Sequence, residues 1–202
     1  MTPNIPETNV AELTTAVAPE ERVAHETSEQ SAAVTPETVA LRKVQGVLAK
    51  PPVVKTAQAM SLFGEHAIGW LAIGAIGAAT DRERRSDWIA ATAGVAAAHA
   101  ASIAVKRVVR RRRPADPEVQ VLVGTPSTLR FPSSHATSTT AAAVLYGGLV
   151  GKRLSPVVVP PMMASRLVLG VHYPSDVVAG STLGGAVAWG VRRYMKRRRN
   201  RG

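Results

Sequence analysis

The chain carries one stretch in which charged and titratable side chains interrupt apolar sequence, Ser165-Arg166-Leu167-Val168-Leu169-Gly170-Val171-His172-Tyr173-Pro174-Ser175-Asp176. A fixed charge such as Arg166 inside an apolar run is costly in a membrane and usually functional. Asp176 follows His172 by four residues, a separation that lets the carboxylate orient the imidazole if the turn is helical. An oriented imidazole beside an arginine is a good nucleophile for phosphorus. The alternative is structural, with Arg166 at a helix end and a loop histidine capped by Asp176.

Outward from this stretch, apolar segments recur along the chain. A helix that spans a bilayer needs about 20 apolar residues, and five segments approach that length: about 62–80, 88–109, 135–150, 155–171 and 177–194. Several lack the polar stripe of a surface helix, which favours a membrane bundle over a soluble Ala-rich one. Two glycine pairs, whose spacing lets helices approach closely in lipid, are Gly147/Gly151 and Gly180/Gly184. We therefore predict an all-α, integral membrane helical bundle with about five transmembrane helices.

The segments that flank this bundle differ in composition. Residues 1–36 are rich in Thr, Glu, Pro, Ala and Ser, which is typical of a disordered acidic tail. Residues 37–57 contain a basic amphipathic pattern, which indicates an interfacial helix or a helix packed against the bundle. The membrane-embedded domain is predicted at 58–195, followed by a basic tail at 196–202. No basic segment leads into an apolar one at the N-terminus, so a cleaved signal peptide is not predicted.

Charge and cysteine content narrow the classes of function. The formal net charge is +11, yet residues 1–41 hold seven of the 14 acids and one of the 25 bases. The basic remainder suits anionic membrane lipids or nucleic acid. Because apolar runs separate the basic clusters, we predict anionic lipids as partners and no nucleic acid. The absence of cysteine excludes disulfides and thiolate chemistry, and the residue pattern leaves the oligomeric state unknown.

The order of the segments also predicts their sidedness. With five spans, the 107–134 loop, the 172–176 turn and the start of the first span share one side of the membrane. The 81–87 and 151–154 loops and the basic C-terminus share the other. Because basic loops favour the cytoplasm, we predict a multi-pass protein of the plasma membrane whose candidate site is extracytoplasmic.

A basic cluster ends the second apolar segment. Lys106 and Arg113 are seven residues apart and Pro114 follows. Since seven residues are about two helical turns, both cations are predicted to project from one face and could clamp a phosphate. The alternative is a basic collar that reaches lipid headgroups, which is the preferred interpretation for Arg107, Arg110, Arg111 and Arg112.

The third apolar segment opens with Phe131-Pro132-Ser133-Ser134-His135-Ala136. Ser133 or Ser134 is a natural helix N-cap, and the amides of a helix N-terminus bind anions. His135 at this position could deliver a proton to a bound phosphate ester. A capped histidine on its own is more often structural, so this interpretation depends on the neighbouring motifs.

Two further polar positions lie in apolar surroundings. Glu65 and His66 begin the first segment on the predicted site side, and they are candidate headgroup contacts. Alternatively, Glu65 pairs with a nearby basic residue. His99 lies in the middle of the second segment, where a hydrogen bond between helices is expected.

Taken in order, Lys106-x6-Arg113-Pro114, Pro132-Ser133-Ser134-His135 and Ser165-Arg166-x5-His172-x3-Asp176 resemble the type 2 phosphatidic acid phosphatase superfamily over residues 60–194. The commonest form of the second motif has glycine where Ser134 stands. The resemblance implies hydrolysis of a lipid phosphate without a metal or other cofactor. It implies His172 as the nucleophile that forms a phosphohistidine, Asp176 as the residue that orients it, and His135 as acid and then base.

The resemblance also implies the phosphate contacts, which are Lys106, Arg113, Ser133, Ser134 and Arg166. Fixed donors around the equatorial oxygens stabilise the transition state. Within the superfamily, the short length, the Gly64-Glu65-His66 segment, Ser134 and the basic C-terminus are similar to actinobacterial enzymes that dephosphorylate decaprenylphosphoryl-5-phosphoribose for cell-wall arabinan synthesis. A polyprenyl-phosphate-type lipid substrate is therefore expected.

Other functions stay open at this point. The substrate could instead be undecaprenyl diphosphate, phosphatidic acid or phosphatidylglycerophosphate. A vanadate-binding haloperoxidase shares the oxyanion site, but such enzymes are larger and soluble. A non-catalytic membrane scaffold would use the basic tails to bind anionic lipid.

Overall fold

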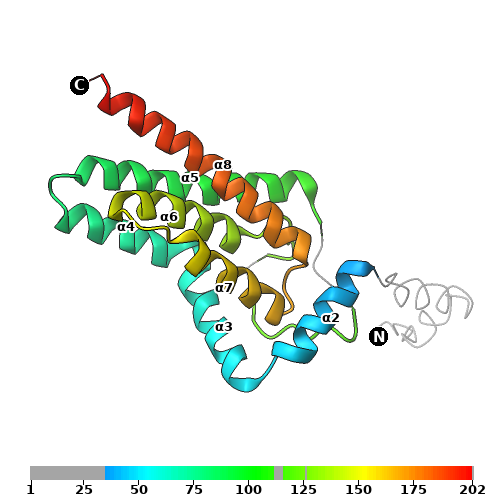
Figure 1. Ribbon diagram of the computed structural model, residues 1–202. Helices are drawn as coiled ribbons and strands as arrows, with labels where there is room; N and C mark the ends of the chain where they lie inside the picture. The colour runs from blue at the N-terminus through cyan, green and yellow to red at the C-terminus, as the bar shows by residue number, and fades with distance from the viewer. Residues whose placement is uncertain (1–34, 112–115, 126, 202) are drawn as a thin grey trace, which may run out of the picture. The chain divides into compact units, whose positions relative to one another are not determined.

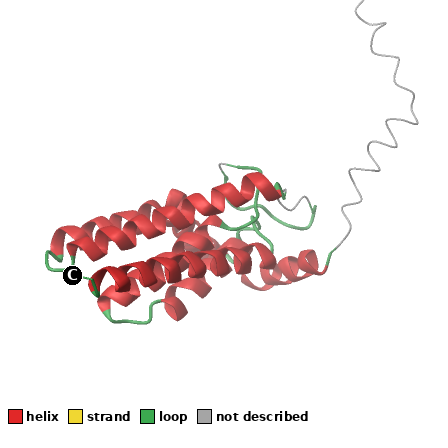
Figure 2. Cartoon of the chain, turned by 90° about the horizontal axis from the view of Figure 1, so that it is seen from above, coloured by secondary structure: helices red, strands yellow, loops and turns green. Residues whose placement is uncertain are grey.

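The computed structural model describes residues 35–111, 116–125 and 127–201, and within these ranges the chain forms helices and loops with no strand (Figures 1 and 2). The helices are α2 (Pro36–Leu48), α3 (Pro51–Gly64), the short 3-10 turn η2 (Glu65–Ala67), α4 (Ile68–Thr80), α5 (Arg85–Val109), α6 (Ser134–Val150), α7 (Ser155–Val168) and α8 (Pro174–Arg199). The prediction of an all-α fold is confirmed. The predicted tail at 1–36 lies outside the described residues except for Thr35, which caps α2, and Pro36, which begins it.

Helix α6 lies at the centre of the bundle, against α5, α7 and α8 (Figure 1). Its buried side chains are mainly Ala, Ser and Thr, and small residues let neighbouring backbones approach closely. A Cβ at Gly184 of α8 would lie 2.2 Å from the carbonyl oxygen of Thr137, and one at Gly180 would lie 2.5 Å from that of Ser133. The predicted close approach at this glycine pair is confirmed.

The other glycine pair ends a helix instead of joining two. Gly151 is the C-cap of α6 and has a left-handed φ of +69°, which suits a residue without a Cβ. Its amide and that of Lys152 donate to the carbonyl of Gly147. A Cβ at Gly147 would lie 2.6 Å from the carbonyl oxygen of Lys152. The predicted helix–helix contact is therefore wrong, and the pair shapes the turn between α6 and α7.

Hydrogen bonds cross the apolar core between α4, α5, α6 and α8. The indole Nε1 of Trp70 donates to the hydroxyl of Thr139 at 3.0 Å, and the hydroxyl of Tyr146 donates to the carbonyl of Trp70 at 3.0 Å. Both aromatic residues belong to the main buried cluster. Since a buried polar group without a partner is costly, these bonds fix how α4 sits on α6.

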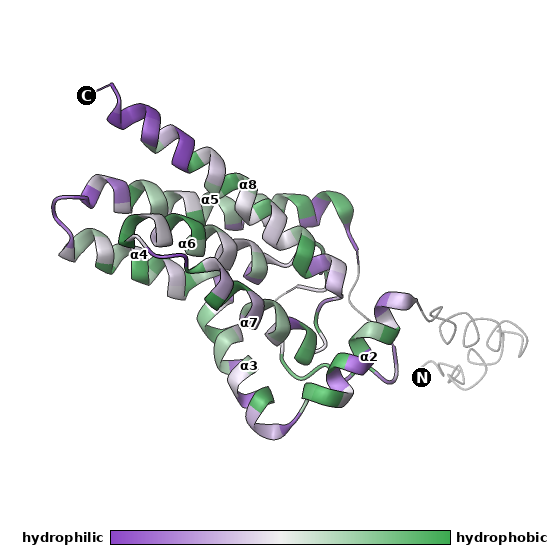
Figure 3. Cartoon of the chain, viewed as in Figure 1, coloured by the Kyte–Doolittle hydropathy of each residue, from purple (hydrophilic) through white to green (hydrophobic). Residues whose placement is uncertain are grey.

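The outside of the bundle exposes many large apolar side chains. Two helical stretches, Pro51–Thr80 and Arg85–Val109, are long and apolar enough to cross a membrane. The large apolar side chains that are more than half exposed include Leu62, Ile68, Ile76, Ile89, Val157, Val178 and Trp189. Figure 3 shows hydrophilic residues gathered at the loop between α4 and α5 and at the end of α8. Large exposed apolar side chains on this scale indicate contact with a membrane or a partner. Two of the five predicted spans have helices of the required length and hydropathy, so the number five stays a prediction.

The loops lie at the two ends of the bundle in the arrangement that the order of segments predicts. At one end, a guanidinium nitrogen of Arg84 donates to the carbonyl of Leu149 at 2.6 Å, and Asp87 lies 4.0 Å from Arg199. The α4–α5 loop, the α6–α7 turn and the end of α8 therefore lie together. The start of α6 and the turn before α8 lie at the other end, where the amide of Ser133 donates to the carbonyl of Asp176.

Three predicted boundaries differ from the structure. Residues 37–57 do not form one helix, because the chain leaves α2 at Ala49 and Pro51 begins α3. The segment expected at 62–80 is broken at η2, where His66 and Ala67 have left-handed φ values of +49° and +61°. Helix α8 continues to Arg199, so the start of the predicted tail at 196–202 is helical.

Helix α2 packs against the protein, as one of the two interpretations of this segment expects, and its position at a membrane surface stays a prediction. Leu41 is fully buried. The side-chain amide of Gln45 donates to the carbonyls of Gln120 and Val168 at 2.7 and 3.0 Å, and its oxygen accepts from the amide of Gln120. Arg42 pairs with Asp116 at 2.6 Å. These contacts join α2 to the loop before α6 and to the end of α7.

The close contact between α6 and α8 gives a stability prediction. Gly184→Ala should lower the free energy of unfolding by about 1–3 kcal/mol, because the added methyl group meets the backbone of Thr137. Gly185→Ala is the matched control, since nothing lies within 4 Å of a Cβ there, and the better helix propensity of Ala should stabilise it by up to about 1 kcal/mol. Thermal unfolding in detergent measures both, and equal stabilities for the two variants would contradict this packing.

Candidate active site

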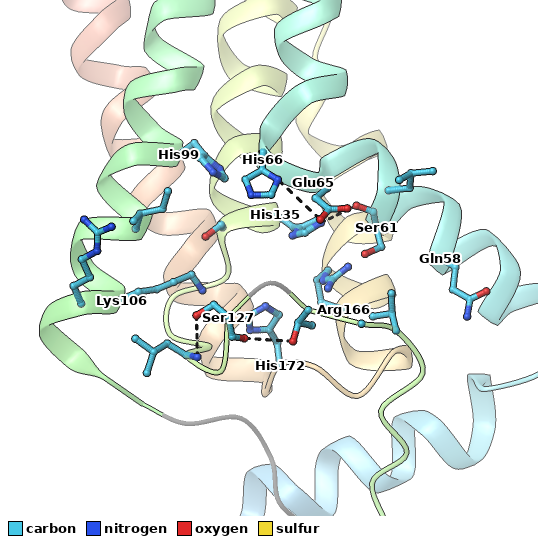
Figure 4. Close-up of a pocket in the computed structure, with 18 residues that line it drawn as sticks. Gln58, Ser61, Glu65, His66, His99, Lys106, Ser127, His135, Arg166 and His172 are labelled. Carbon is cyan, nitrogen blue, oxygen red and sulfur yellow. Dashed lines mark hydrogen bonds and ion pairs between the residues drawn. The ribbon is translucent and has the colours of Figure 1, made fainter.

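A cavity of about 510 Å³ lies at the end of the bundle where α3, α5, α6 and α7 meet. Its lining includes one or more residues from each of the three sequence motifs: Lys106, Ser134, His135, Arg166 and His172. Figure 4 shows His135, Arg166 and His172 directed toward the same space. The two histidines therefore share one site, as the motif order predicts.

The turn before α8 holds the imidazole of His172 against a buried carboxylate. Tyr173 is the N-cap residue of α8, and its amide donates to Oδ2 of Asp176 at 2.8 Å. The same Oδ2 lies 3.7 Å from Nδ1 of His172. This distance exceeds that of a hydrogen bond, but it places the negative charge on the Nδ1 side of the ring. Nε2 is then the nitrogen opposite the carboxylate.

Two arginines stabilise the charge of Asp176. Nη1 of Arg111 donates to Oδ1 of Asp176 at 3.1 Å, and Nε of Arg130 lies 3.8 Å from Oδ2. Burial would raise the pKa of Asp176, but the neighbouring imidazole, the Tyr173 amide and the Arg130 charge together lower it. The carboxylate is therefore ionised at neutral pH. The interpretation of Arg111 as part of a lipid-facing collar is wrong, because its guanidinium contacts this carboxylate.

His135 lies in the first turn of α6 and is fixed from the side of α3. Its Nε2 lies 2.9 Å from the carbonyl oxygen of Ser61. Since a carbonyl can only accept, Nε2 carries a proton and Nδ1 is the basic nitrogen. Gly64 permits this contact, because a Cβ there would lie 2.6 Å from Cδ2 of His135. The break between α3 and α4 follows directly after this glycine.

The two serines before His135 have different roles. Ser133 is fully buried, its hydroxyl accepts from the amide of Ala136, and its own amide donates to the carbonyl of Asp176 at 2.9 Å. It does not line the cavity, so the structure does not support the predicted phosphate contact of Ser133. Ser134 does line it, and its hydroxyl is hydrogen bonded to that of Ser102 at 2.8 Å.

The cations of the predicted clamp reach the cavity by different routes. Arg166 lies in the last turn of α7 and is 2% exposed. Nζ of Lys106 donates to the carbonyls of Arg130 and Pro132 at 3.1 and 2.8 Å, so this side chain also fixes the loop before α6. The prediction of one shared helical face assumed a helix that continues past Lys106 for two turns, but α5 ends at Val109. Arg113 itself lies outside the described residues.

The opposite wall of the cavity is polar as well. It contains Glu65, His66 and His99 (Figure 4). Nδ1 of His66 lies 4.0 Å from the carboxylate of Glu65, and the rings of His66 and His99 are 6.3 Å apart. Nδ1 of His99 is buried and has no hydrogen-bond partner among the described residues. The predicted helix–helix hydrogen bond of His99 is therefore not formed at this atom.

The sequence motifs missed several residues that build the site. They are Glu37, Ser61, Arg111, Arg130 and Tyr173. Tyr173 adjoins His172 and caps the helix that holds Asp176, so the third motif could have indicated it. The partners of the other four lie far away in the chain, so residue spacing gives no signal for them. Within residues 35–111, 116–125 and 127–201, no three His, Cys, Asp or Glu side chains are grouped so as to hold a metal ion.

Comparison with known proteins agrees with this arrangement. Residues 87–200 match the sequence pattern of the PAP2 superfamily. A protein of Mycolicibacterium smegmatis named decaprenylphosphoryl-5-phosphoribose phosphatase is 54% identical over 145 residues, which cover 71% of this chain and 81% of the relative. A protein of the same name from Mycobacterium tuberculosis is 51% identical over 152 residues, covering 75% and 86%.

The fold has a counterpart among solved structures. The crystal structure of a transmembrane PAP2-type phosphatidylglycerolphosphate phosphatase from Bacillus subtilis aligns with a TM-score of 0.66 at 19% identity, covering 89% of this chain and 96% of that one. At this identity the likeness concerns the fold alone. From the family pattern and the two relatives, we conclude that the chain belongs to the PAP2 superfamily and is a phosphoric monoester hydrolase.

Proposed function

We propose that the protein removes the 5-phosphate from decaprenylphosphoryl-5-phosphoribose and so supplies decaprenylphosphoryl ribose for cell-wall arabinan. The observation that carries this proposal is one cavity, at the end of an apolar bundle, that contains His135, Arg166 and His172. Two relatives with more than half of the aligned residues identical carry the name of this activity. Undecaprenyl diphosphate, phosphatidic acid and phosphatidylglycerophosphate are the alternative substrates.

The proposed reaction proceeds in two displacements. Nε2 of His172 attacks phosphorus, the bond from phosphorus to the ribose oxygen breaks, and a phosphohistidine forms. Nδ1 of His135, protonated at this stage, gives its proton to the leaving oxygen. His135 then takes a proton from water as the water oxygen attacks phosphorus. The phosphorus–nitrogen bond breaks, and phosphate leaves.

Cations replace a metal ion in this proposal. Lys106 and Arg166 line the cavity and are nearly buried, so their charges act in a medium of low dielectric constant. Donors fixed there, together with Ser134 and the predicted contribution of Arg113, would stabilise the charge that the equatorial oxygens share.

The polar wall suits the sugar of the proposed substrate. Glu65, His66 and His99 offer both donors and acceptors to ribose hydroxyls, and Nδ1 of His99 has no hydrogen-bond partner in the described chain. His99 precedes Lys106 by seven residues on α5, or roughly 10 Å along the helix. In the proposed complex, a ribose ring would lie between a phosphate at Lys106 and a hydroxyl contact at His99.

The proposed location is the plasma membrane, with several passes and an extracytoplasmic site. The apolar surface of the bundle supports a membrane location. The basic residues gathered at the end of α8 support a cytoplasmic C-terminus.

Phosphate release by the purified protein tests the substrate. Decaprenylphosphoryl-5-phosphoribose should have a kcat/KM at least roughly tenfold above that of the three alternative lipids, because only it has the sugar hydroxyls. Glu65→Gln and His66→Ala should reduce this preference without reducing turnover of phosphatidic acid. Each assay is run with and without EDTA, and a complete loss in EDTA that added metal reverses would contradict the cation-based mechanism. Equal or faster turnover of phosphatidic acid by the wild type would reject the proposed substrate.

His172→Ala tests the nucleophile. Turnover should fall on the order of 10³-fold or more, since the attacking atom is removed, while the melting temperature in detergent stays close to that of the wild type. An acid-labile, base-stable phosphoenzyme should be trapped on the wild type and absent from the variant. His25→Ala is the control, because this histidine lies outside all three motifs. If His172→Ala were as active as the wild type, His172 could not be the nucleophile and the proposed mechanism would be wrong.

Cysteine labelling tests the orientation, since the native chain has no cysteine. A cysteine introduced at Thr128, which is exposed on the loop before α6, should react with a membrane-impermeant maleimide in intact cells. A cysteine at Arg82, in the α4–α5 loop, should react only after permeabilisation. The reverse pattern would place the site in the cytoplasm.

A further inference from the structure

Helix α2 reaches the turn that carries the proposed nucleophile. Oε1 of Glu37, in the first turn of α2, accepts from the amide of Ser175 at 3.1 Å. Thr38, the next residue, has its hydroxyl 3.3 Å from that of Tyr173. Both contacts join α2 to the first residues of α8, although well over a hundred positions separate them in the sequence.

Arg111 connects Glu37 to the carboxylate of Asp176. Nη2 of Arg111 forms a short ion pair with Oε2 of Glu37. Nη1 of the same guanidinium donates to Oδ1 of Asp176 at 3.1 Å and to the hydroxyl of Ser175 at 2.7 Å. A guanidinium that binds two acceptors through two nitrogens has a fixed plane. The position of Glu37 therefore determines the direction from which Arg111 approaches Asp176.

Glu37 is ionised in this arrangement. Burial would raise its pKa, but hydrogen bonds from Ser175 and Arg111 outweigh that effect and lower it. At neutral pH, the carboxylate of Glu37 balances the charge of Arg111, which otherwise acts on Asp176 alone.

We propose that Glu37 is a positioning residue, which holds Arg111 against Asp176 and thereby sets the orientation and basicity of His172. Glu37 does not line the cavity, so its effect on the reaction passes through Arg111 and Asp176. The proposal rests on the proposed function, in which His172 is the nucleophile and Asp176 orients it. It also gives α2 a role in catalysis, in addition to its packing.

Charge determines the direction of each effect. Removing the negative charge of Glu37 leaves Arg111 less balanced, which disfavours the imidazolium and lowers the pKa of His172. Removing the positive charge of Arg111 strengthens the field of the two carboxylates and raises that pKa. Besides Glu37 and Arg111, four charged or titratable groups face the His172–Asp176 pair. They are Arg130 of the loop before α6, Lys106 of α5, His135 of α6 and Arg166 of α7.

The test compares Glu37→Gln, Arg111→Gln and the double variant, assayed with whichever lipid phosphate the wild-type protein turns over. Glu37→Gln should lower kcat roughly tenfold and leave KM within about twofold, since Glu37 does not contact the cavity. The acidic limb of its kcat/KM profile should move to lower pH by roughly half a unit to one unit. Arg111→Gln should move that limb to higher pH, and the double variant should return it close to the wild-type position.

Glu118→Gln is the matched control. Like Glu37, Glu118 pairs with an arginine: its carboxylate lies 2.7 Å from Arg42 of α2. Its side chain, however, is 70% exposed, and it is not paired with Arg111. This variant should keep the wild-type kcat and pH profile. Glu37→Asp, which keeps the charge, should restore part of the kcat lost in Glu37→Gln.

Three results would overturn the inference: wild-type kcat and pH profile in Glu37→Gln, equal losses in Glu37→Gln and Glu118→Gln, or shifts of the same sign in Glu37→Gln and Arg111→Gln. His172→Ala and Asp176→Asn are measured in parallel. If either keeps wild-type turnover, the proposed function of this site fails irrespective of Glu37. If both are inactive and Glu37→Gln behaves like the wild type, only the role of Glu37 is rejected.

Discussion

A single buried residue, Asp176, joins the parts of this site. Its carbonyl accepts from the amide of Ser133 at the start of α6, and its carboxylate accepts from the amide of Tyr173 at the start of α8. The same carboxylate faces the imidazole of His172 and binds Arg111. An ionised carboxylate without partners would be very costly at zero exposure. Its partners are therefore required by the fold as well as by the chemistry.

The small side chains of α6 and α8 bring these two helix starts together. Because Gly180 and Gly184 lie against the backbone of α6, α8 begins directly beside Ser133. His135 and His172, which follow and precede these two starts, then line one cavity. A larger residue at either glycine would separate the helices and with them the two imidazoles. The packing of the apolar helices therefore sets the distance between the two histidines at the polar end.

Some positively charged side chains at or near the cavity also fix the surrounding structure through hydrogen bonds and ring contacts. Lys106 lines it and binds two carbonyls of the loop that leads into α6. Arg130 does not line the cavity, but its Cζ lies 3.8 Å from the ring centroid of Tyr173 and its Nε lies 3.8 Å from Oδ2 of Asp176. Groups held in this way need little reorganisation when charge develops on a bound phosphate, which is the condition for electrostatic catalysis. On the opposite wall, His66 and Ala67 adopt left-handed backbone conformations, and the chain turns sharply there beside His135.

The sequence by itself determined the helical class and the helix limits of α5 and α6 to within a few residues, and it marked Arg166 and the two histidines as functional candidates. It did so because apolar runs report helices, and because a charge or imidazole inside such a run is too costly to persist without a role. The meeting of these three residues in one site was expected from the resemblance of the three motifs to a known superfamily. Only the tertiary structure decided the roles of Ser133, Arg111 and Glu37. Arg111 reaches Glu37 across 74 residues of sequence and Asp176 across 65. Local spacing carries no information about such partners. The chain has several similar arginines and serines near these positions, and only the packing between distant helices determines which arginine contacts the carboxylate of Asp176 and which serine contacts its carbonyl.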